Sequence, residues 1–348
     1  MTLKMTTQNQ INKRINQRLE LALSRFVGVK NALLFSSCRN ALYTLIKSLE
    51  LKETDEVLVQ SFICDSLPMA IEKAGAKPIL IEVNEETFNL DSRIVEEAIN
   101  ENTRAVLFVH TYGNPSGIEE ISGLCKKHNL ILIEDIAHAL GASCNGKAAG
   151  SFGDYTIYSL TKQMVNFGGG ALLTNRNLRG IIELRDEEKN KPVRLNYPKR
   201  FMASLYETRA FFLSKLLIDF VRKRADLKLA NLLSSHFYCT KIEAYFALRQ
   251  LTNLPNTILL KRKNYDYLKK YVNTQRIEGD SSFNYLSLVF PDKKTRDLAL
   301  KKHFLFLPPW DGSTISERLI FIPNNPKFTR KELNSIVNVY NKVYKMGV

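Results

Sequence analysis

The chain has 348 residues, 45% of them hydrophobic and 24% charged, which is the composition of a globular protein with room for two domains. Its five cysteines are widely spaced, without a C-x-x-C pair, and its five histidines are scattered, which argues against a disulfide framework and a zinc site. The formal net charge of +15 favours anionic partners, but basic and acidic residues are interleaved, so we expect a solvated basic surface and no nucleic-acid partner.

No targeting or membrane-spanning segment is evident. The first ten residues are polar and lack the apolar core of a secretory signal, and no apolar stretch is long and uncharged enough to span a bilayer. Residues 207–233 are apolar and basic, so they could form a helix at a membrane surface; we favour a helix packed on the core or at a dimer interface. With thiols expected to be reduced, the sequence favours a cytoplasmic protein.

The first half of the chain alternates between apolar, strand-like runs and amphipathic helices. Strands are predicted at residues 32–36, 56–59, 78–83, 105–110, 130–134, 155–159 and 170–174. Helices are predicted at residues 40–51, 66–73, 92–100 and 118–127. The strands are continuous apolar runs, which is typical of strands buried on both faces of a mainly parallel sheet. The expected fold class is therefore α/β, with three layers in the order α/β/α.

Beyond residue 175 the pattern changes. Residues 183–233 are rich in charged and large apolar side chains and show no strand pattern. Further along we predict a long helix or a helix pair broken near Pro255, then two strands and two helices, at residues 242–270, 285–290, 295–302, 318–322 and 330–344. We therefore expect a larger domain over residues 1–235, whose N-terminal residues could pack on the other domain, and a smaller α+β domain over 236–348.

Polar residues follow several of the predicted strands, where an open parallel sheet binds its ligands. Ser37 and Arg39 open the helix after the first strand and could hold a phosphate, although a plain N-cap is the commoner role of such a serine. Asp135 could pair with the pyridinium N–H of pyridoxal phosphate (PLP) or form an ordinary cap or ion pair. Lys162 follows Ser159 by three residues and precedes a glycine cluster, and a desolvated lysine there would be a nucleophilic amine. The order of these residues, more than any one of them, indicates a PLP site.

Several longer motifs agree with this interpretation. Residues 76–91, 109–115, 133–142, 150–154 and 242–251 read AKPILIEVNEETFNLD, VHTYGNP, IEDIAHALGA, GSFGD and IEAYFALRQL. Together they resemble the DegT/DnrJ/StrS family of PLP-dependent sugar aminotransferases, whose fold is that of the type I aminotransferases. The resemblance extends over most of the chain but not over residues 180–235.

The resemblance implies roles for individual residues. Lys162 corresponds to the lysine that holds PLP as a Schiff base, and Asp135 to the partner of the pyridine nitrogen. His138 corresponds to a residue near the phenolic oxygen, and Ser159 to a phosphate-binding serine. The spacing from Ser159 to Lys162 is shorter than is usual in the family.

Other positions of the expected cofactor site depart from the family pattern. Cys38 and Arg39, beside Ser37, replace a Gly-Thr pair that holds the phosphate. Cys64 stands where a ring-stacking aromatic is common, and Phe62 could take over that contact. The remaining residues assigned to the site are Ala137 and His236, the latter near an asparagine that reaches the partner subunit's phosphate.

By resemblance, the chain is expected to be a homodimeric enzyme that moves an amino group from glutamate to a nucleotide-linked keto-sugar, for polysaccharide or related amino-sugar biosynthesis. A PLP-dependent sugar dehydratase on the same fold is one alternative, but such enzymes replace the lysine, typically by histidine, and this chain has Lys162. A degenerate relative with a regulatory or nucleic-acid-binding role is another, which the altered cofactor contacts and the basic charge keep open.

Overall fold

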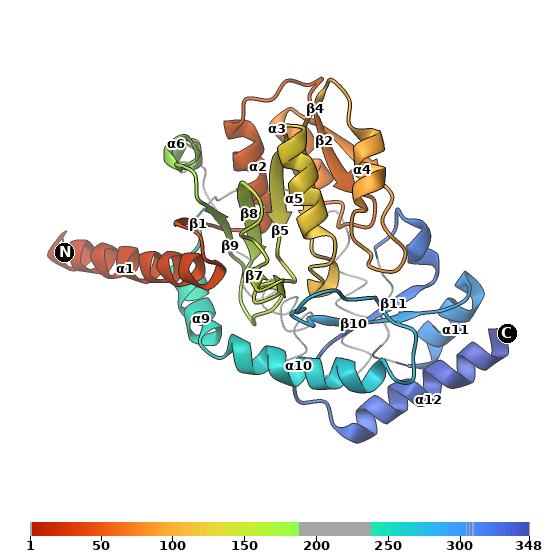
Figure 1. The fold of residues 1–348 in the computed structure, drawn as a ribbon. Helices are drawn as coiled ribbons and strands as arrows, with labels where there is room; N and C mark the ends of the chain where they lie inside the picture. Colours follow the sequence, from red (N-terminus) through yellow and green to blue (C-terminus); the bar gives the residue numbers. More distant parts are fainter. Residues whose placement is uncertain (1, 188–237, 304, 306, 308–309, 348) are drawn as a thin grey trace.

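The computed structural model describes residues 2–187, 238–303, 305, 307 and 310–347. Its centre is a seven-stranded sheet in the order β1-β9-β8-β5-β4-β2-β3 (Figure 1). The strands are β1 (Asn31–Phe35), β2 (Glu56–Gln60), β3 (Lys77–Ile81), β4 (Thr103–Val109), β5 (Ile131–Asp135), β8 (Tyr155–Ser159) and β9 (Gly170–Thr174). All strand pairs in the part β8-β5-β4-β2-β3 of the sheet are parallel. The strand β9 is antiparallel to both of its neighbours, β1 and β8. The mainly parallel sheet confirms the predicted α/β class.

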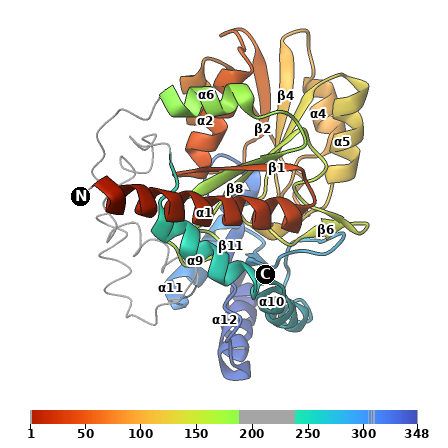
Figure 2. The same ribbon diagram turned by 90° about the vertical axis from the view of Figure 1, so that its left-hand side faces the viewer.

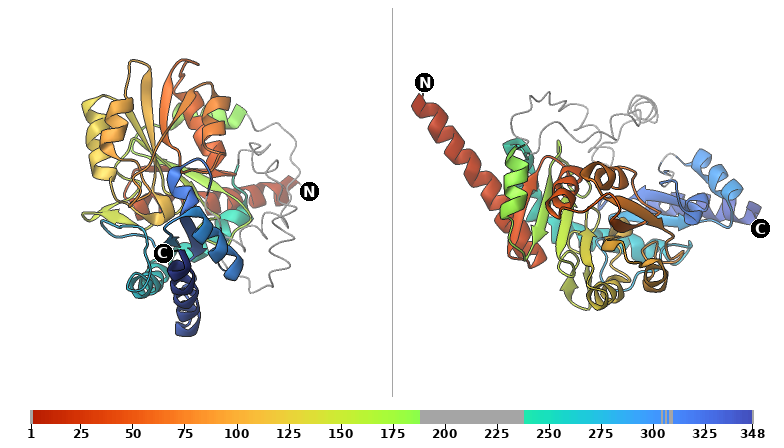
Figure 3. Two further views of the ribbon diagram at one scale, coloured as in Figure 1. Left: turned by 90° about the vertical axis from the view of Figure 1, so that its right-hand side faces the viewer. Right: turned by 90° about the horizontal axis from the view of Figure 1, so that it is seen from above.

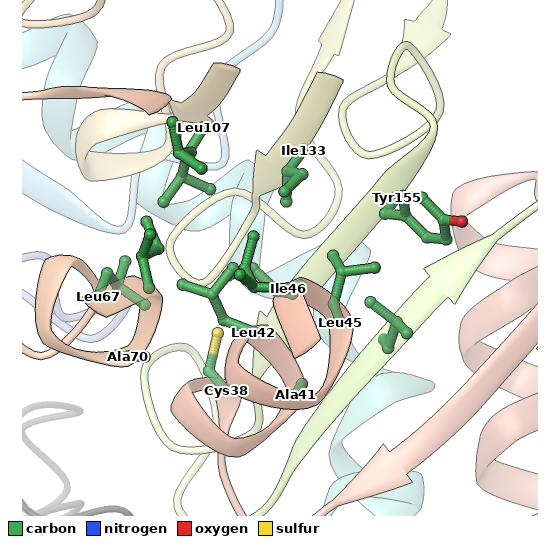
Figure 4. Close-up of a cluster of buried hydrophobic side chains, with 14 of the residues drawn as sticks. Cys38, Ala41, Leu42, Leu45, Ile46, Leu67, Ala70, Leu107, Ile133 and Tyr155 are labelled. Carbon is green, nitrogen blue, oxygen red and sulfur yellow. The ribbon is translucent and has the colours of Figure 1, made fainter. Parts of the chain in front are cut away.

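Helices cover both faces of the sheet, because alternate residues of the buried strands point to opposite sides. In β4, Leu107 belongs to one core cluster and Phe108 to another. The first face is covered by α2 (Cys38–Ser48), α3 (Pro68–Ala74) and α6 (Arg179–Glu187). The second is covered by α1 (Thr2–Val27), α9 (Lys241–Leu251), α4 (Ser92–Ala98) and α5 (Ile118–Lys127). Figure 4 shows part of the first of these clusters, which includes Cys38, Leu42 and Leu67.

A smaller group of elements follows at the C-terminal end. The strands β10 (Tyr285–Val289) and β11 (Leu319–Pro323) pair antiparallel, and α11 (Lys293–Lys302), α12 (Arg330–Gly347) and the end of α10 (Leu254–Leu268) pack against them in a separate core cluster. The N- and C-termini lie at opposite ends of the molecule when it is viewed from above (Figure 3). Predicted residues 242–270 form a helix pair, since α9 ends at Leu251 and Pro255 lies in the first turn of α10.

Four features go beyond the sequence prediction, and helix α6 is one of them. Helix α1 was not predicted; its Leu19, Leu23 and Val27 pack against the sheet and against α9, beside which it lies in Figure 2. A hairpin of two short strands, β6 (Ser143–Cys144) and β7 (Lys147–Ala148), turns at an Asn-Gly pair with positive φ at both residues. The 3₁₀ turns η1 (Thr111–Gly113) and η3 (Thr314–Glu317) complete the described elements. The division into domains at 235/236 remains a prediction.

Across the described ranges, no helix combines the length and the apolar surface that crossing a lipid bilayer requires. His236 and residues 207–233, which carried the predictions of a cross-subunit contact and of a surface helix, lie outside the described residues.

Candidate active site

One cavity of about 390 Å³ opens at the carboxyl ends of the parallel strands. It is lined by residues from the start of α2, the loop after β2, the ends of β4, β5 and β8, the segment between β8 and β9, and the segment before the 3₁₀ turn η3. These residues include Ser37, Cys38, Arg39, Cys64, Val109, Asp135, Ala137, His138, Ser159, Lys162, Phe167 and Trp310. Chain segments that are far apart in sequence therefore meet at the edge of the sheet where ligands bind in open α/β folds.

The first turn of α2 forms one wall of the cavity. The hydroxyl of Ser37 accepts a hydrogen bond of 3.2 Å from the amide of Asn40 and so caps the helix. β9 passes very close to this turn, because a Cβ on Gly170 would lie 2.3 Å from the carbonyl carbon of Ser37. Burial raises the pKa of the Cys38 thiol well above its ordinary value, with a smaller contribution from Asp135, so this thiol stays protonated at neutral pH. The wall thus offers backbone N–H groups, the guanidinium of Arg39 and uncharged polar groups.

Asp135 is buried at the end of β5. Its Oδ1 accepts a hydrogen bond of 2.7 Å from the amide of Ala137, and no other hydrogen bond to the carboxylate is present within the described part of the chain. Desolvation by burial raises the pKa of Asp135 to about 6, although the Ala137 amide, His110 and Lys162 act in the opposite direction. The carboxylate is therefore a desolvated acceptor beside the cavity.

Lys162 lies in a tightly held turn after β8. Gln163, the next residue, bonds both main-chain groups of Leu140, at 2.8 and 3.0 Å. The main-chain carbonyl of Lys162 accepts a hydrogen bond of 3.3 Å from the side-chain amide of Asn284. Before the lysine, the hydroxyls of Ser159 and Thr161 lie 3.1 Å apart. The bonds made by Gln163 and Asn284 hold the main chain around Lys162, which lines the cavity.

His138 and Trp310 form an aromatic wall. Their rings are stacked, with centroids 5.6 Å apart and an interplanar angle of 6°. Burial, then the charges of Lys162 and Lys261, lower the pKa of His138 well below its ordinary value, so its imidazole is uncharged at neutral pH. Trp310 was missed by the sequence analysis, because it comes from the C-terminal part of the chain and follows no strand of the main sheet.

Phe62, expected to replace the stacking aromatic, does not line the cavity. It is fully buried in a cluster behind the cavity wall, where its ring contacts those of Phe88, Tyr112 and Trp310 at centroid distances of 6.4, 6.0 and 5.4 Å. The physical reason is that a phenyl ring gains more from burial in this cluster than from a place at the cavity surface. Cys64, two residues later, does line the cavity.

Glu134, which precedes Asp135, is a second residue whose role the sequence did not reveal. It has no solvent exposure, and it accepts hydrogen bonds of 2.7 Å from the amides of Gly150, Phe152 and Gly153. Its Oε2 also lies 2.9 Å from Nε2 of His110. The carboxylate therefore ties the GSFGD loop to the end of β5, and this fixes β5 and Asp135 relative to β8 and Lys162.

A comparison with known protein families shows to which family the chain belongs. The family model described as the DegT/DnrJ/EryC1/StrS aminotransferase family matches residues 3–284. The chain belongs to this family. The match includes the cavity residues from α2, β5 and β8 but ends before Trp310, so the aromatic wall combines family-matched and unmatched parts of the chain.

Individual relatives agree with this membership. A pleiotropic regulatory protein of Geobacillus stearothermophilus is 33% identical over 162 residues, and a GDP-perosamine synthase of Vibrio cholerae is 34% identical over 163 residues. Each alignment covers 46% of this chain and 44% of the relative, so less than half of these curated relatives is matched. The structure of the aminotransferase TlmJ from Streptoalloteichus hindustanus superposes with a TM-score of 0.77 over 96% of this chain and 92% of TlmJ, at 17% identity. This last similarity confirms the expected aminotransferase fold.

Proposed function

We propose that the protein is a PLP-dependent aminotransferase that moves an amino group from an amino acid, glutamate by family resemblance, to a nucleotide-linked keto-sugar in amino-sugar or polysaccharide biosynthesis. The observation that carries the proposal is that Lys162 and Asp135 line one cavity at the carboxyl edge of the sheet. Membership of the family supports the reaction class. The name of the Vibrio relative, a GDP-perosamine synthase, supports a nucleotide-linked sugar as the acceptor.

The residues around the cavity fit PLP. Asp135 is a buried carboxylate with only one hydrogen-bond donor among the described residues, so it has acceptor capacity for the N–H of a protonated pyridine ring. Without such a partner, burying the charged carboxylate is costly. The first turn of α2, with Arg39 and nearby Ser159, offers amide, guanidinium and hydroxyl donors to a phosphate.

Bound PLP supplies an electron sink that stabilises the negative charge developing on a donor's α-carbon. Lys162 would hold the cofactor covalently through Nζ, and as an amine it would accept the proton from that α-carbon. Asp135 would keep the ring nitrogen protonated. His138, uncharged because of its burial, would donate or accept one hydrogen bond at the phenolic oxygen.

The aromatic contact to the cofactor ring is assigned differently from the sequence expectation. Trp310 lines the cavity and stacks on His138, whereas Phe62 lies behind the wall. We therefore propose Trp310, not Phe62, as the aromatic side chain that contacts the bound ring or substrate.

We also propose that the protein is a cytoplasmic homodimer, as the family resemblance implies. All five cysteines are free, which agrees with a reducing compartment. The dehydratase alternative is disfavoured by the presence of Lys162 at the cavity. The name of the Geobacillus relative keeps a regulatory role as a competing hypothesis, which an assay of turnover separates from catalysis.

The test is turnover of purified protein with PLP, glutamate and a panel of nucleotide-linked keto-sugars, followed by mass spectrometry of 2-oxoglutarate and of the aminated sugar. We expect equimolar formation of both products with at least one acceptor, loss of turnover in Lys162→Ala, and normal turnover in the control Lys126→Ala, which changes an exposed lysine on α5. A protein that binds PLP but leaves glutamate and every acceptor unchanged contradicts the proposal.

A further inference from the structure

Residues 281–284, just before β10, contact two separate parts of the candidate active site. All four residues are at most 5% exposed, and none of them lines the cavity. The hydroxyl of Ser282 donates a hydrogen bond to the main-chain carbonyl of His138. The side-chain amide of Asn284 donates a hydrogen bond of 3.3 Å to the main-chain carbonyl of Lys162. One short segment from the C-terminal part of the chain therefore holds two cavity residues from behind.

The backbone of this segment has an unusual conformation. Phe283 has a φ of 51°, in the left-handed region that bulky side chains rarely adopt because of steric crowding. Its amide donates a hydrogen bond of 2.9 Å to the hydroxyl of Ser281, and its carbonyl accepts one of 3.0 Å from the side chain of Asn324. The surrounding contacts thus maintain a strained residue between Ser282 and Asn284, and such strain is concentrated at functional sites.

The contact between Ser282 and His138 depends on Gly113, in the turn after β4. The amide of Ser282 donates a hydrogen bond of 3.2 Å to the carbonyl of Gly113, whose φ is 96°. A Cβ on Gly113 would lie 2.9 Å from the carbonyl oxygen of His138 and closer still to the Ser282 hydroxyl. Glycine leaves the space in which this hydroxyl reaches the carbonyl, and the His138 ring, on the same residue, is the one that stacks on Trp310.

Asn284 is held at both ends of its side-chain amide. Its Oδ1 accepts a hydrogen bond of 2.8 Å from the buried ammonium group of Lys261. Because an ammonium group can only donate, this bond fixes which end of the amide is the oxygen, and Nδ2 faces the carbonyl of Lys162. The main-chain carbonyl of Asn284 also accepts a hydrogen bond of 3.0 Å from the amide of Asn324. The donor offered to Lys162 therefore has a defined position.

We infer that Ser282 and Asn284 are positioning residues that together set the spacing between His138 and Lys162 across the cavity. The inference deepens the proposed function, on which it rests, because Lys162 would hold the cofactor through Nζ while His138 would contact its phenolic oxygen. A misplacement of about 1 Å can lower the rate of a reaction about 100-fold. Since neither Ser282 nor Asn284 lines the cavity, each acts through the main chain of the residue that it holds.

Two substitutions remove the two contacts separately. Ser282→Ala deletes the hydroxyl that bonds the carbonyl of His138. Asn284→Asp keeps an oxygen for the ammonium group of Lys261 but deletes the N–H donor that bonds the carbonyl of Lys162. Because the aspartate variant retains its buried partner, its folding does not depend on the outcome for Ser282→Ala.

The first readouts need no cofactor. Trp310 is the only tryptophan of the chain, and its ring is stacked on that of His138, so its fluorescence reports on this wall of the cavity. In cofactor-free Ser282→Ala we expect a shifted Trp310 emission and stronger quenching by acrylamide. Hydrogen exchange followed by peptide mass spectrometry should show faster exchange in residues 137–142.

Asn284→Asp should act on the other wall. We expect faster hydrogen exchange in residues 160–165, with the Trp310 emission unchanged. The matched control is Ser287→Ala, on β10, because Ser287 is also buried and its hydroxyl accepts a hydrogen bond of 3.0 Å from the amide of Gln275. This control should lower the stability of the protein without changing the emission or the exchange of either segment.

In the PLP-loaded enzyme, Ser282→Ala and Asn284→Asp should each lower kcat about tenfold and leave KM for the amino donor within about twofold, because they misplace reacting groups without removing a substrate contact. Unchanged emission in Ser282→Ala together with unchanged exchange in Asn284→Asp overturns the inference, and so does an equal loss of kcat in Ser287→Ala. A protein that binds no PLP contradicts the proposed function, while emission and exchange still test the two positioning residues.

Discussion

Replacement of Glu134 by glutamine is expected to destabilise the protein severely, although it changes a single atom of a side chain that does not line the cavity. The carboxylate accepts three main-chain hydrogen bonds of 2.7 Å and lies 2.9 Å from His110, with no solvent exposure. A glutamine offers one acceptor oxygen, and its NH₂ group cannot accept. If that NH₂ occupies the position of Oε2, it faces the amide of Gly150, which loses its partner.

The magnitude follows from these contacts. Loss of a bond to an ionised acceptor costs about 1.5–3 kcal/mol, and the two remaining bonds, at Phe152 and Gly153, lose roughly half their strength without the charge. His110 can adapt by changing tautomer and adds little. We therefore expect the free energy of unfolding to fall by about 4 kcal/mol, a large part of the 5–15 kcal/mol that is typical of a folded protein.

The assay is urea denaturation of cofactor-free protein, followed by circular dichroism, with the midpoint and the slope compared between variants. Glu96→Gln is the matched control, because this carboxylate is 46% exposed and pairs with Lys127 on the surface. Its loss should cost less than about 1 kcal/mol. If Glu134→Gln is no more destabilising than this control, the role assigned to Glu134 in holding the GSFGD loop is wrong.

Three further predictions concern other parts of the site. Gly170→Ala should destabilise the fold and weaken phosphate binding, because the new Cβ would lie 2.3 Å from the carbonyl carbon of Ser37. The control Gly180→Ala, on helix α6 with open space around it, should be neutral or stabilising by about 0.5–1 kcal/mol, and thermal unfolding compares the two variants. Asp135→Asn should abolish tight PLP binding yet stabilise the cofactor-free protein above pH 6, because burial raises the pKa of the Asp135 carboxyl from its ordinary value near 4 to about 6. The gain in free energy of unfolding should be about 3 kcal/mol at pH 7 and should vanish below pH 4. Urea midpoints measured at pH 7 and below pH 4 check this difference. Burial lowers the pKa of Lys261 from 10.5 to about 8, so the cost of burying its charge is fully present below pH 8 and is relieved as the pH rises to 10.5. Lys261→Met should therefore be more stabilising at pH 7 than at pH 10.5, by about 3 kcal/mol in urea titrations. An equal effect at both pH values contradicts the claim that Lys261 is buried with its charge.

The sequence predicted the sheet and the order of the site residues because both leave local signals. Strands buried on both faces are short continuous apolar runs, and each is followed by the polar residue that the sheet edge exposes. The seven strands appear where they were expected, and Lys162, Asp135, His138 and Ser159 line one cavity. Their roles toward PLP remain proposals until the cofactor is bound.

What the sequence did not predict depends on tertiary packing. Phe62 and Trp310 are both aromatic, and only the folded chain shows that the first lies behind the cavity wall and the second in it. Lys261 is one of two lysines on α10, and no periodicity identifies the buried one. The hairpin at Asn145-Gly146 did have a local signal, the Asn-Gly pair of a tight turn, which the sequence analysis did not use.

The measurement that tests the central claim most directly is reduction of the PLP-loaded protein with borohydride, followed by peptide mass spectrometry. We predict a single pyridoxyl-phosphate adduct on Lys162, together with a visible absorbance band that is present before reduction and absent from Lys162→Ala. A protein that takes up no PLP, or one that carries the adduct on another lysine while Lys162 remains unmodified, would contradict the account.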